Sequence, residues 1–479
     1  MNTAKCRLSL TEGVQALAVA SAAAAFSLVE GRLIADPVGL RLALGGAAIA
    51  VVGAVGFRSP RSLLYGLILW LPALGLIRRL ALQVQPAPRH DPLLLVAPLA
   101  LIVLFLVSVR GSPFPKRTAV AKGMLALGVF VLCGAVNPLQ GSPLAGVGGL
   151  LFVGVPLLAF WIGKRFCDDA MFARLLKVTA IAGVAAAAYG LFQTLHGFPS
   201  WDRHWIAVSG YGALNVGGTV RAFGSLTSGS EYALLVSVAF VIVAVFWLRR
   251  SGWALIALAA LGTAIVLESS RGAVVMSLLA LAVVASARVG LSMRSAALVG
   301  GVALFALSFA ASHLLGATSA SAGTSGLVSH QVRGLANPLD AKSSTLPVHL
   351  KLVEQGIKTA ITEPVGLGIG AVTIASDKFG GRSAGTEADP SNAAVALGLP
   401  GLIAYLVVFV AGMRAAFDVA RRRRDSLSLI ALGILVVTLL QWLNGGNYAV
   451  ALLPWLALGW LDRQLDRSHP DSDLERSPA

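Results

Sequence analysis

The stretch Tyr232-Ala-Leu-Leu-Val-Ser-Val-Ala-Phe-Val-Ile-Val-Ala-Val-Phe-Trp-Leu248 contains no charged residue. Its length falls in the range of about 17–25 residues that a helix needs to cross the hydrocarbon core of a bilayer. Backbone groups in that core must be hydrogen-bonded within the protein, so an unbroken apolar run is expected to be helical. A transmembrane β-barrel would show short segments of alternating polarity instead. The stretch therefore predicts a membrane-spanning α-helix.

The same pattern recurs along the whole chain. Of the 479 residues, 56% are hydrophobic and 13% are charged, whereas a soluble domain carries about 25% charged residues. We predict an all-α polytopic membrane protein with about fourteen transmembrane helices, in a range of about twelve to fourteen. The expected spans are residues 13–29, 38–57, 62–77, 93–109, 123–136, 144–163, 178–195, 232–248, 252–267, 272–287, 295–312, 394–411, 426–443 and 448–461. We expect the first span to be retained and not cleaved as a signal peptide, because Asp36 and Pro37 follow it and another apolar run begins directly.

Short basic clusters set the expected orientation. The net charge of +16 comes from Lys and Arg that stand between apolar runs, which is the pattern of the positive-inside rule and not that of a nucleic-acid-binding surface. The clusters are residues 164–177, Arg249–Arg250, residues 288–294 and residues 414–424, the last including Arg421–Arg424. With an even number of spans, both termini are then cytoplasmic. Arg78, Arg79 and Arg89 fall on the outer side, so either the span count differs there or these arginines have another purpose.

This orientation predicts the domain organisation. We expect an N-terminal transmembrane bundle at 1–195, an outer loop at 196–231, transmembrane helices at 232–312, a large outer loop at 313–393, C-terminal transmembrane helices at 394–462 and a cytoplasmic tail at 463–479. Residues 344–363 of the large loop predict an amphipathic helix, with Leu350, Val353 and Ile357 on one side. A glycine-rich turn, Gly366-Leu-Gly-Ile-Gly370, follows it and is expected to turn the backbone towards the membrane.

Two arginines at the outer surface are candidates for binding an anion. Arg271 lies in Leu267-Glu-Ser-Ser-Arg-Gly272, a tight hairpin between two spans, and Arg221 lies in Thr219-Val-Arg-Ala-Phe-Gly224. A guanidinium binds phosphate in a bidentate manner and stays protonated. Two of them at headgroup depth can bind a lipid diphosphate and stabilise it as a leaving group. The alternative is that both anchor helix ends among lipid headgroups, and the residues alone favour neither reading.

These motifs together resemble the O-antigen ligase and O-antigen polymerase superfamily. The resemblance rests on Arg221-Ala-Phe-Gly224, Ser269-Ser-Arg-Gly-Ala273, Glu363-Pro-Val-Gly-Leu-Gly-Ile-Gly370 and Ser391-Asn-Ala-Ala-Val-Ala-Leu-Gly-Leu-Pro-Gly-Leu402. It covers roughly residues 189–443 and depends on the order and spacing of the motifs.

The resemblance implies a glycosyltransferase of the GT-C type, without metal or other cofactor, in the bacterial inner membrane. Such enzymes take a glycan from undecaprenyl diphosphate on the periplasmic face. The acceptor is lipid A–core for a ligase and a second lipid-linked repeat unit for a polymerase. By this resemblance Arg221 and Arg271 bind the diphosphate. Glu268 flanks Arg271 and is expected to pair with the arginines, and Ser391, Asn392 and Lys351 are expected to be further supporting residues.

One position departs from the ligase pattern. Ligases have a histidine before the asparagine of the late motif, and here that residue is Ser391. Inverting transfer needs a group that accepts the proton of the acceptor hydroxyl. The candidates are Glu387 and Asp389, followed by His349 and His330, although Glu387 and Asp389 can equally be solvated loop charges. The missing histidine favours a polymerase over a ligase.

Two readings of other classes remain open at this point. A transporter or flippase needs ionisable residues near the membrane midplane, and the charges here cluster at span ends. A non-catalytic scaffold in a glycan-export complex is the other alternative, in which the missing histidine marks lost activity.

Overall fold

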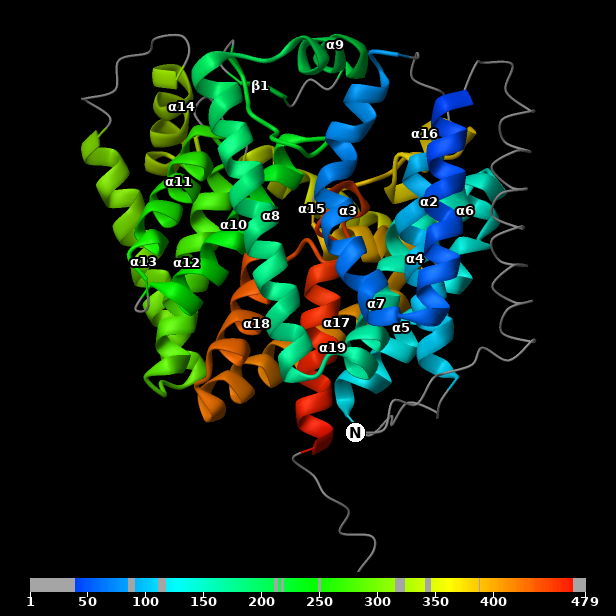
Figure 1. Ribbon diagram of the computed structural model, residues 1–479. Coiled ribbons are helices and arrows are strands. Elements are labelled where there is room, and N and C mark those ends of the chain that lie inside the picture. Colours follow the sequence, from blue (N-terminus) through cyan, green and yellow to red (C-terminus); the bar gives the residue numbers. More distant parts are fainter. Residues whose placement is uncertain are drawn as a thin grey trace, which may run out of the picture. The chain divides into compact units, whose positions relative to one another are not determined.

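The structure is a computed structural model that describes residues 39–84, 91–110, 118–210, 214–216, 219–248, 251–314, 324–340, 346–386 and 388–467. These residues are almost entirely helical (Figure 1). Eight of the described helices are long and apolar enough to cross a membrane. They are Pro60–Ala81, Pro92–Val109, Pro143–Phe166, Asp169–His196, Gly229–Trp247, Arg271–Arg288, Met293–Leu314 and Asp389–Arg423. The all-α membrane architecture is confirmed, and the count of about fourteen spans stays a prediction.

Every expected span from residue 38 onward overlaps a described helix. Four of these helices are apolar but shorter: Gly45–Arg58, Ala119–Ala135, Trp253–Leu267 and Ser426–Val437. The expected first span at 13–29, the Arg249–Arg250 cluster and the residues after 467 lie outside the described part.

The chain divides into two compact units, and the first comprises Met1–Pro113 and Phe198–Gly210. Its described elements are α2 (Gly39–Arg58), α3 (Pro60–Ala81), η1 (Pro92–Leu95), α4 (Val96–Val109) and α9 (Ser200–Ser209). Helix α2 packs on α3 and α4, and α9 packs on α3.

The basic end of α3 is neutralised inside this first unit. Arg79 binds Asp202 of α9 at 2.8 Å, and both side chains are fully buried. Arg78 binds Asp91 at 2.7 Å and lies over the ring of Trp205. A buried cation needs such a partner because of its desolvation. These two arginines, which the positive-inside rule does not explain, therefore hold the first unit together, and Arg89 lies outside the described residues.

The second unit comprises Phe114–Gly197 and Tyr211–Ala479. Its first half contains α5 (Ala119–Ala135), η2 (Pro138–Gln140), α6 (Pro143–Gly149), η3 (Leu150–Gly154), α7 (Val155–Phe166), α8 (Asp169–His196), β1 (Asn215–Val216), β2 (Thr219–Val220) and α10 (Gly229–Trp247). Its second half contains α11 (Trp253–Leu267), α12 (Arg271–Arg288), α13 (Met293–Leu314), α14 (Thr324–Ala336), α15 (Leu346–Thr362), η6 (Ile369–Val372), α16 (Ala375–Phe379), α17 (Asp389–Arg423), α18 (Ser426–Val437), η7 (Gly445–Asn447) and α19 (Leu452–Arg467).

Packing in the second unit joins helices that are distant in sequence. Helix α5 packs along α17, α7 along α19, and α8 along α10. Residues 114–197 therefore form one compact unit with the helices after residue 210, and the expected N-terminal bundle at 1–195 stays a prediction. Distant helices join in this way because apolar helix faces are buried wherever they fit, without regard to sequence separation.

Helix α17 is broken at Gly398, which has a φ of 68° and precedes Pro400 by two residues. The backbone of the glycine-rich turn binds at the break: Leu367 N–H donates to the carbonyl of Val395 at 2.8 Å, and Gly368 N–H donates to that of Ala396 at 3.0 Å. Backbone groups freed by a helix break inside a membrane protein need such partners. The turn thus returns to the transmembrane bundle, as its glycines led us to expect.

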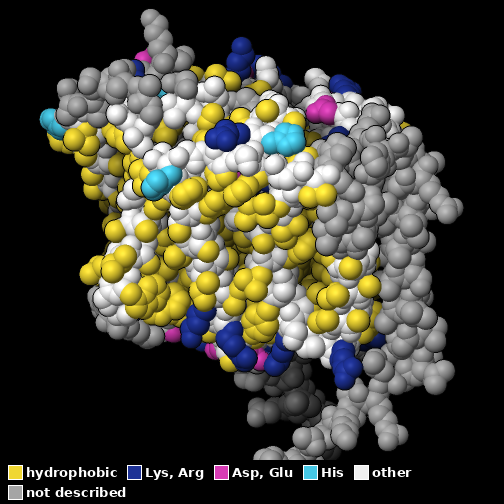
Figure 2. All heavy atoms as spheres, turned by 45° about the horizontal axis from the view of Figure 1, so that its top comes forward, with side chains coloured by type: hydrophobic (Ala, Val, Ile, Leu, Met, Phe, Trp, Pro, Cys, Tyr) yellow, Lys and Arg dark blue, Asp and Glu magenta, His cyan; other side chains and the backbone are white. Residues whose placement is uncertain are grey.

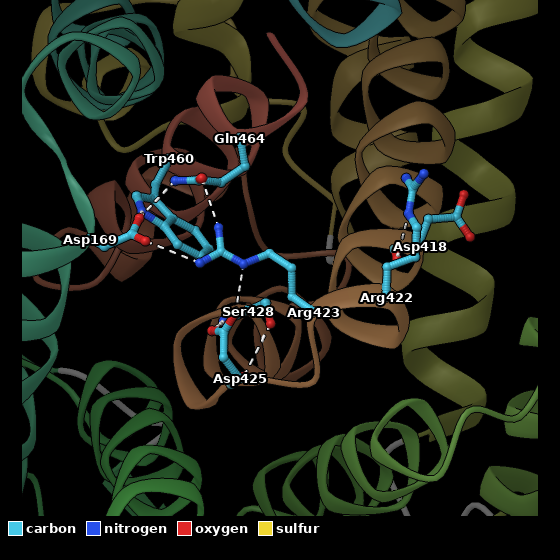
Figure 3. A network of polar contacts seen from close by, with 8 residues as sticks. All are labelled: Asp169, Asp418, Arg422, Arg423, Asp425, Ser428, Trp460 and Gln464. Carbon is cyan, nitrogen blue, oxygen red and sulfur yellow. Dashed lines mark hydrogen bonds and ion pairs between the residues drawn. The ribbon is translucent and has the colours of Figure 1, made fainter. Parts of the chain in front are cut away.

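One end of the second unit gathers the basic clusters that predict the cytoplasmic side; we call it the inner end. Arg423 at the end of α17 binds Asp169 at 3.0 Å, Asp425 at 2.6 Å and Gln464 at 2.7 Å, and its guanidinium lies over the ring of Trp460 (Figure 3). The network joins the ends of α8, α17, α18 and α19. These helix ends therefore lie on the same side of the unit.

A second cluster strengthens the inner end. Lys164 of α7 binds Asp462 at 2.5 Å and Asp466 at 2.7 Å on α19. On the face shown in Figure 2, hydrophobic side chains cover the middle, and Lys and Arg lie along the lower edge and in the upper part. Helix α13 shows the same apolar exposure, since Leu298 is 70% and Phe305 73% exposed. This arrangement suits a lipid-facing surface with a basic border.

Candidate anion-binding site

The opposite end of the second unit, which we call the outer end, carries Arg221 and Arg271. Arg221 directly follows the β1–β2 ribbon, and its N–H donates to the carbonyl of Leu214 at 2.7 Å. Buried Gln193 of α8 holds the next two residues: its Oε1 accepts from the N–H groups of Phe223 at 3.1 Å and Gly224 at 2.8 Å. Its Nε2 also donates to the carbonyl of Gly224 at 3.3 Å. The backbone on both sides of Arg221 is therefore fixed.

Arg221 pairs with Glu268, the residue that follows α11. The guanidinium Nη1 lies 3.2 Å from Oε1 of Glu268, whose side chain is fully buried. Ser270 N–H donates to the other carboxylate oxygen at 3.0 Å. Burial raises the pKa of Glu268 to about 8, although Arg221 and the Ser270 N–H act in the opposite direction. Gly229 leaves room for the pair, because a Cβ there would lie 2.7 Å from Oε1 of Glu268.

A tight turn presents Arg271. Ser269 adopts a φ of 65°, a left-handed conformation that is uncommon for a residue other than glycine. Its hydroxyl lies 3.2 Å from the carbonyl of Leu327 and 3.0 Å from Nδ1 of His330, both on α14. Gln331 also donates to the carbonyl of Ser270 at 3.3 Å. Helix α14 therefore docks on this turn, at the end of the unit where Figure 1 shows it above α11 and α13.

The guanidinium of Arg271 is held by a histidine. Its Nη2 lies 2.9 Å from Nε2 of His330. A guanidinium only donates hydrogen bonds, so Nε2 must be the unprotonated nitrogen and Nδ1 carries the proton. Nδ1–H then donates to the Ser269 hydroxyl, which donates in turn to the carbonyl of Leu327. The three contacts thus define one tautomer of a neutral imidazole.

The charge around His330 is strongly positive. Burial, together with the positive charges of Arg271, Arg221 and Arg333, lowers the pKa of His330 to about 4. Among the described residues, no carboxylate pairs with Arg271 or Arg333, so Glu268 balances only one of the three cations. The Nε atoms of Arg221 and Arg271 are buried and have no hydrogen-bond partner in the described part of the chain. An excess of convergent guanidinium donors is the chemistry that binds an oxyanion such as phosphate.

The structure therefore brings together Arg221, Arg271 and Glu268 from the set of predicted site residues. It adds His330, named among the second candidates for the base, and Arg333, which the sequence analysis missed. The signal for Arg333 was its spacing, since residues three apart lie on the same side of a helix and α14 contains both His330 and Arg333.

Other predicted residues lie in the first turn of α17 and contact the segment before it. Thr386 N–H and hydroxyl donate to Oδ1 of Asn392 at 2.7 and 2.9 Å, and the buried hydroxyl of Ser391 donates to the carbonyl of Ala388 at 2.8 Å. Ser391 and Asn392 thus close this turn. Glu387 lies outside the described residues.

The carboxylate of Asp389 is fully buried. Its Oδ2 accepts from the N–H groups of Trp442 and Leu443 and from the Tyr405 hydroxyl. It therefore anchors the 440–443 turn to the start of α17. His349 and Lys351 lie on α15, where His349 is half-buried and Lys351 is exposed.

Glu231 also has a structural position. It accepts from the N–H and hydroxyl of Thr227 and from the N–H of Ala449, and so joins the start of α10 to the 444–449 turn.

Comparison with models of known protein families gave no match, and comparison with curated proteins gave none either.

Proposed function

We propose that this chain is a metal-independent membrane glycosyltransferase that uses a glycan linked to undecaprenyl diphosphate on the periplasmic face of the bacterial inner membrane. One observation carries the proposal: Arg221 and Arg271 both border the Glu268–Ser270 turn and both act on the charge of His330. Three guanidinium groups with one nearby carboxylate suit a doubly phosphorylated ligand.

The reaction would be an inverting transfer. The acceptor hydroxyl oxygen bonds to the anomeric carbon of the donor glycan, and the bond from that carbon to the diphosphate oxygen breaks. The electron pair leaves with undecaprenyl diphosphate, and the hydroxyl proton passes to a basic side chain. Arg221 and Arg271 would stabilise the negative charge that develops on the leaving diphosphate. Glu387, Asp389 and His349 stay the predicted proton acceptors.

Polymerisation of a surface polysaccharide is the preferred form of this reaction. Ser391 replaces the histidine that the ligase resemblance leads one to expect, and its hydroxyl is buried in a hydrogen bond to its own turn. Ligation to lipid A–core is the second candidate, because Arg221 and Arg271 would serve both reactions equally.

Purified protein and a lipid-linked oligosaccharide provide the test. Lengthened lipid-linked product supports the polymerase, and transfer to added lipid A–core supports the ligase. If neither product forms, the transferase proposal fails. Uptake of the oligosaccharide into protein-containing vesicles would then identify a flippase, and its absence would favour the scaffold.

A further inference from the structure

The side chain that holds Arg271 differs in kind from those that hold Arg79 and Arg221. Arg79 is paired with a buried carboxylate, and so is Arg221. Arg271 is held by an imidazole that must be neutral to accept its hydrogen bond. A carboxylate partner neutralises a guanidinium and competes with phosphate for the same donors, whereas a neutral acceptor orients the guanidinium and leaves its charge in place.

The surroundings of His330 preserve this neutral state. Arg271 of α12 faces Nε2 of His330. The positive charges of Arg221, which follows β2, and of Arg333, one turn further along α14, also disfavour protonation of the imidazole. The carboxylate of Glu268 is engaged by Arg221 and by the Ser270 N–H. Three positive charges disfavour a fourth on the imidazole. On the other side, Ser269 and the carbonyl of Leu327 keep the proton on Nδ1.

We propose that His330 is a positioning residue, which holds Arg271 by a neutral acceptor so that the guanidinium keeps its full charge for a diphosphate. The inference rests on the proposed binding of a diphosphate at Arg271. Gly334 supports the arrangement, because a Cβ there would lie 1.8 Å from Nε of Arg271, so α14 lies directly against the guanidinium. His330 acts through Arg271 and takes no part in bond formation.

Two substitutions with side chains of equal length distinguish the positioning role of His330 from a purely structural one. His330→Gln supplies a neutral carbonyl acceptor, and His330→Glu supplies a charged one that pairs with Arg271. We expect His330→Gln to bind inorganic pyrophosphate with a dissociation constant within about threefold of wild type, and His330→Glu to bind it about tenfold or more weakly. The measurement is calorimetric titration of the purified full chain with pyrophosphate. His196→Glu is the matched control, because His196 is exposed at the end of α8 and should leave binding unchanged.

The inference fails if His330→Glu binds pyrophosphate as tightly as wild type, if the Gln and Glu variants weaken it equally, or if wild type does not bind it. A double-mutant cycle covers the case in which His330→Glu is also less stable. In an Arg271→Ala background the loss of binding that His330→Glu adds should be much smaller than in the wild-type background, and an added loss as large as in wild type contradicts the role.

The same variants distinguish this inference from the proposed function. If the expected binding pattern holds and no lipid-linked glycan is lengthened or transferred, the positioning role stands and the transferase proposal fails. If wild type and His330→Glu transfer glycan at equal rates, the transferase proposal stands and the positioning role fails.

Discussion

Arg79, Arg221 and Arg271 each have a different side-chain partner, and the partner determines how much positive charge each guanidinium keeps. Arg79 and Asp202 are both fully buried and form a structural ion pair. Arg221 keeps 14% of its side chain exposed while it pairs with Glu268. Arg271 donates to a neutral histidine. The net charge left for a ligand therefore rises in this order, and Arg271 is the residue on which anion binding should depend most.

Substitution of Arg271 should remove most of the glycan-transfer activity while the amount of folded protein stays the same. We expect Arg271→Ala to lower the rate of glycan transfer by about 10²–10³-fold, as removal of one stabilising donor typically does. Arg271→Lys keeps the positive charge but loses the planar guanidinium that binds phosphate in a bidentate manner. Its rate should therefore lie between those of wild type and Arg271→Ala. Arg414→Ala, at an exposed position of α17, is the control. Equal rates for Arg271→Ala and the control would remove Arg271 from the site.

Gln193 fixes the backbone beside Arg221, so its loss should loosen that segment. Gln193→Leu leaves the N–H groups of Phe223 and Gly224 buried without their acceptor. Each such unpaired group costs about 1–3 kcal/mol, and we expect a lower thermal unfolding temperature together with weaker pyrophosphate binding. Gln355→Leu, on the exposed side of α15, should change neither property. An unaltered melting temperature in Gln193→Leu would mean that water replaces its amide.

At the scale of elements, two irregular features define the outer half of the second unit. Helix α17 breaks at Gly398 and receives the turn that contains Gly366 and Gly368. Helix α14 contributes no transmembrane span, yet it holds the Ser269–Arg271 turn through His330 and Gln331. Both features depend on contacts between segments that are far apart in sequence.

The break in α17 should tolerate no side chain. A Cβ on Gly398 would lie 2.1 Å from the carbonyl oxygen of Pro364, and its φ of 68° costs a non-glycine residue about 1–2 kcal/mol in addition. We expect Gly398→Ala to lower the unfolding temperature and the amount of folded protein. Gly301→Ala in α13 is the control, because nothing lies within 4 Å of its Cβ position and alanine favours the helix. Equal stability of the two variants would show that the break can straighten.

The docking of α14 should weaken in acid. The pKa of His330 lies at about 4 in the folded protein, below its ordinary value of 6.5. A detached α14 therefore takes up a proton more readily than a docked one, so docking is unaffected above 6.5 and weakens as the pH falls towards 4. Hydrogen exchange of the α14 amides, corrected for intrinsic rates, should accelerate over this range in wild type but not in His330→Gln. Identical pH dependence in both would assign the effect to another group.

At the scale of the whole molecule, the second unit carries different kinds of polar residues at its two ends. Its inner end gathers Arg423 and its carboxylate partners (Figure 3), and Lys164 with Asp462 and Asp466. Its outer end gathers the candidate anion-binding site and the turns anchored by Glu231 and Asp389. In the described part of the chain, the basic residues Lys164 and Arg423 therefore lie together and apart from Arg221 and Arg271.

Cysteine labelling should detect this separation. In a background with Cys6, Cys133 and Cys167 replaced by serine, Lys351→Cys should react with a membrane-impermeant maleimide in intact spheroplasts. Arg421→Cys should react only after the membrane is permeabilised, because both positions are exposed but we expect them on opposite sides. Labelling of both in intact spheroplasts would contradict the orientation on which the proposed function depends.

The sequence by itself predicted Arg221, Arg271 and Glu268 as members of one site, and it determined that the chain is an all-α membrane protein and where most of its helices run. These properties follow from local composition, since long apolar runs can satisfy their backbone in lipid only as helices. Only the tertiary structure decided that Arg79 is a structural residue, that α5 packs along α17 and α7 along α19, and that His330 rather than a carboxylate holds Arg271. Those features depend on contacts between residues such as Arg271 and His330, which lie 59 positions apart. Hydrophobic periodicity carries no information about which distant segments meet, because any apolar face can be buried against any other of suitable shape.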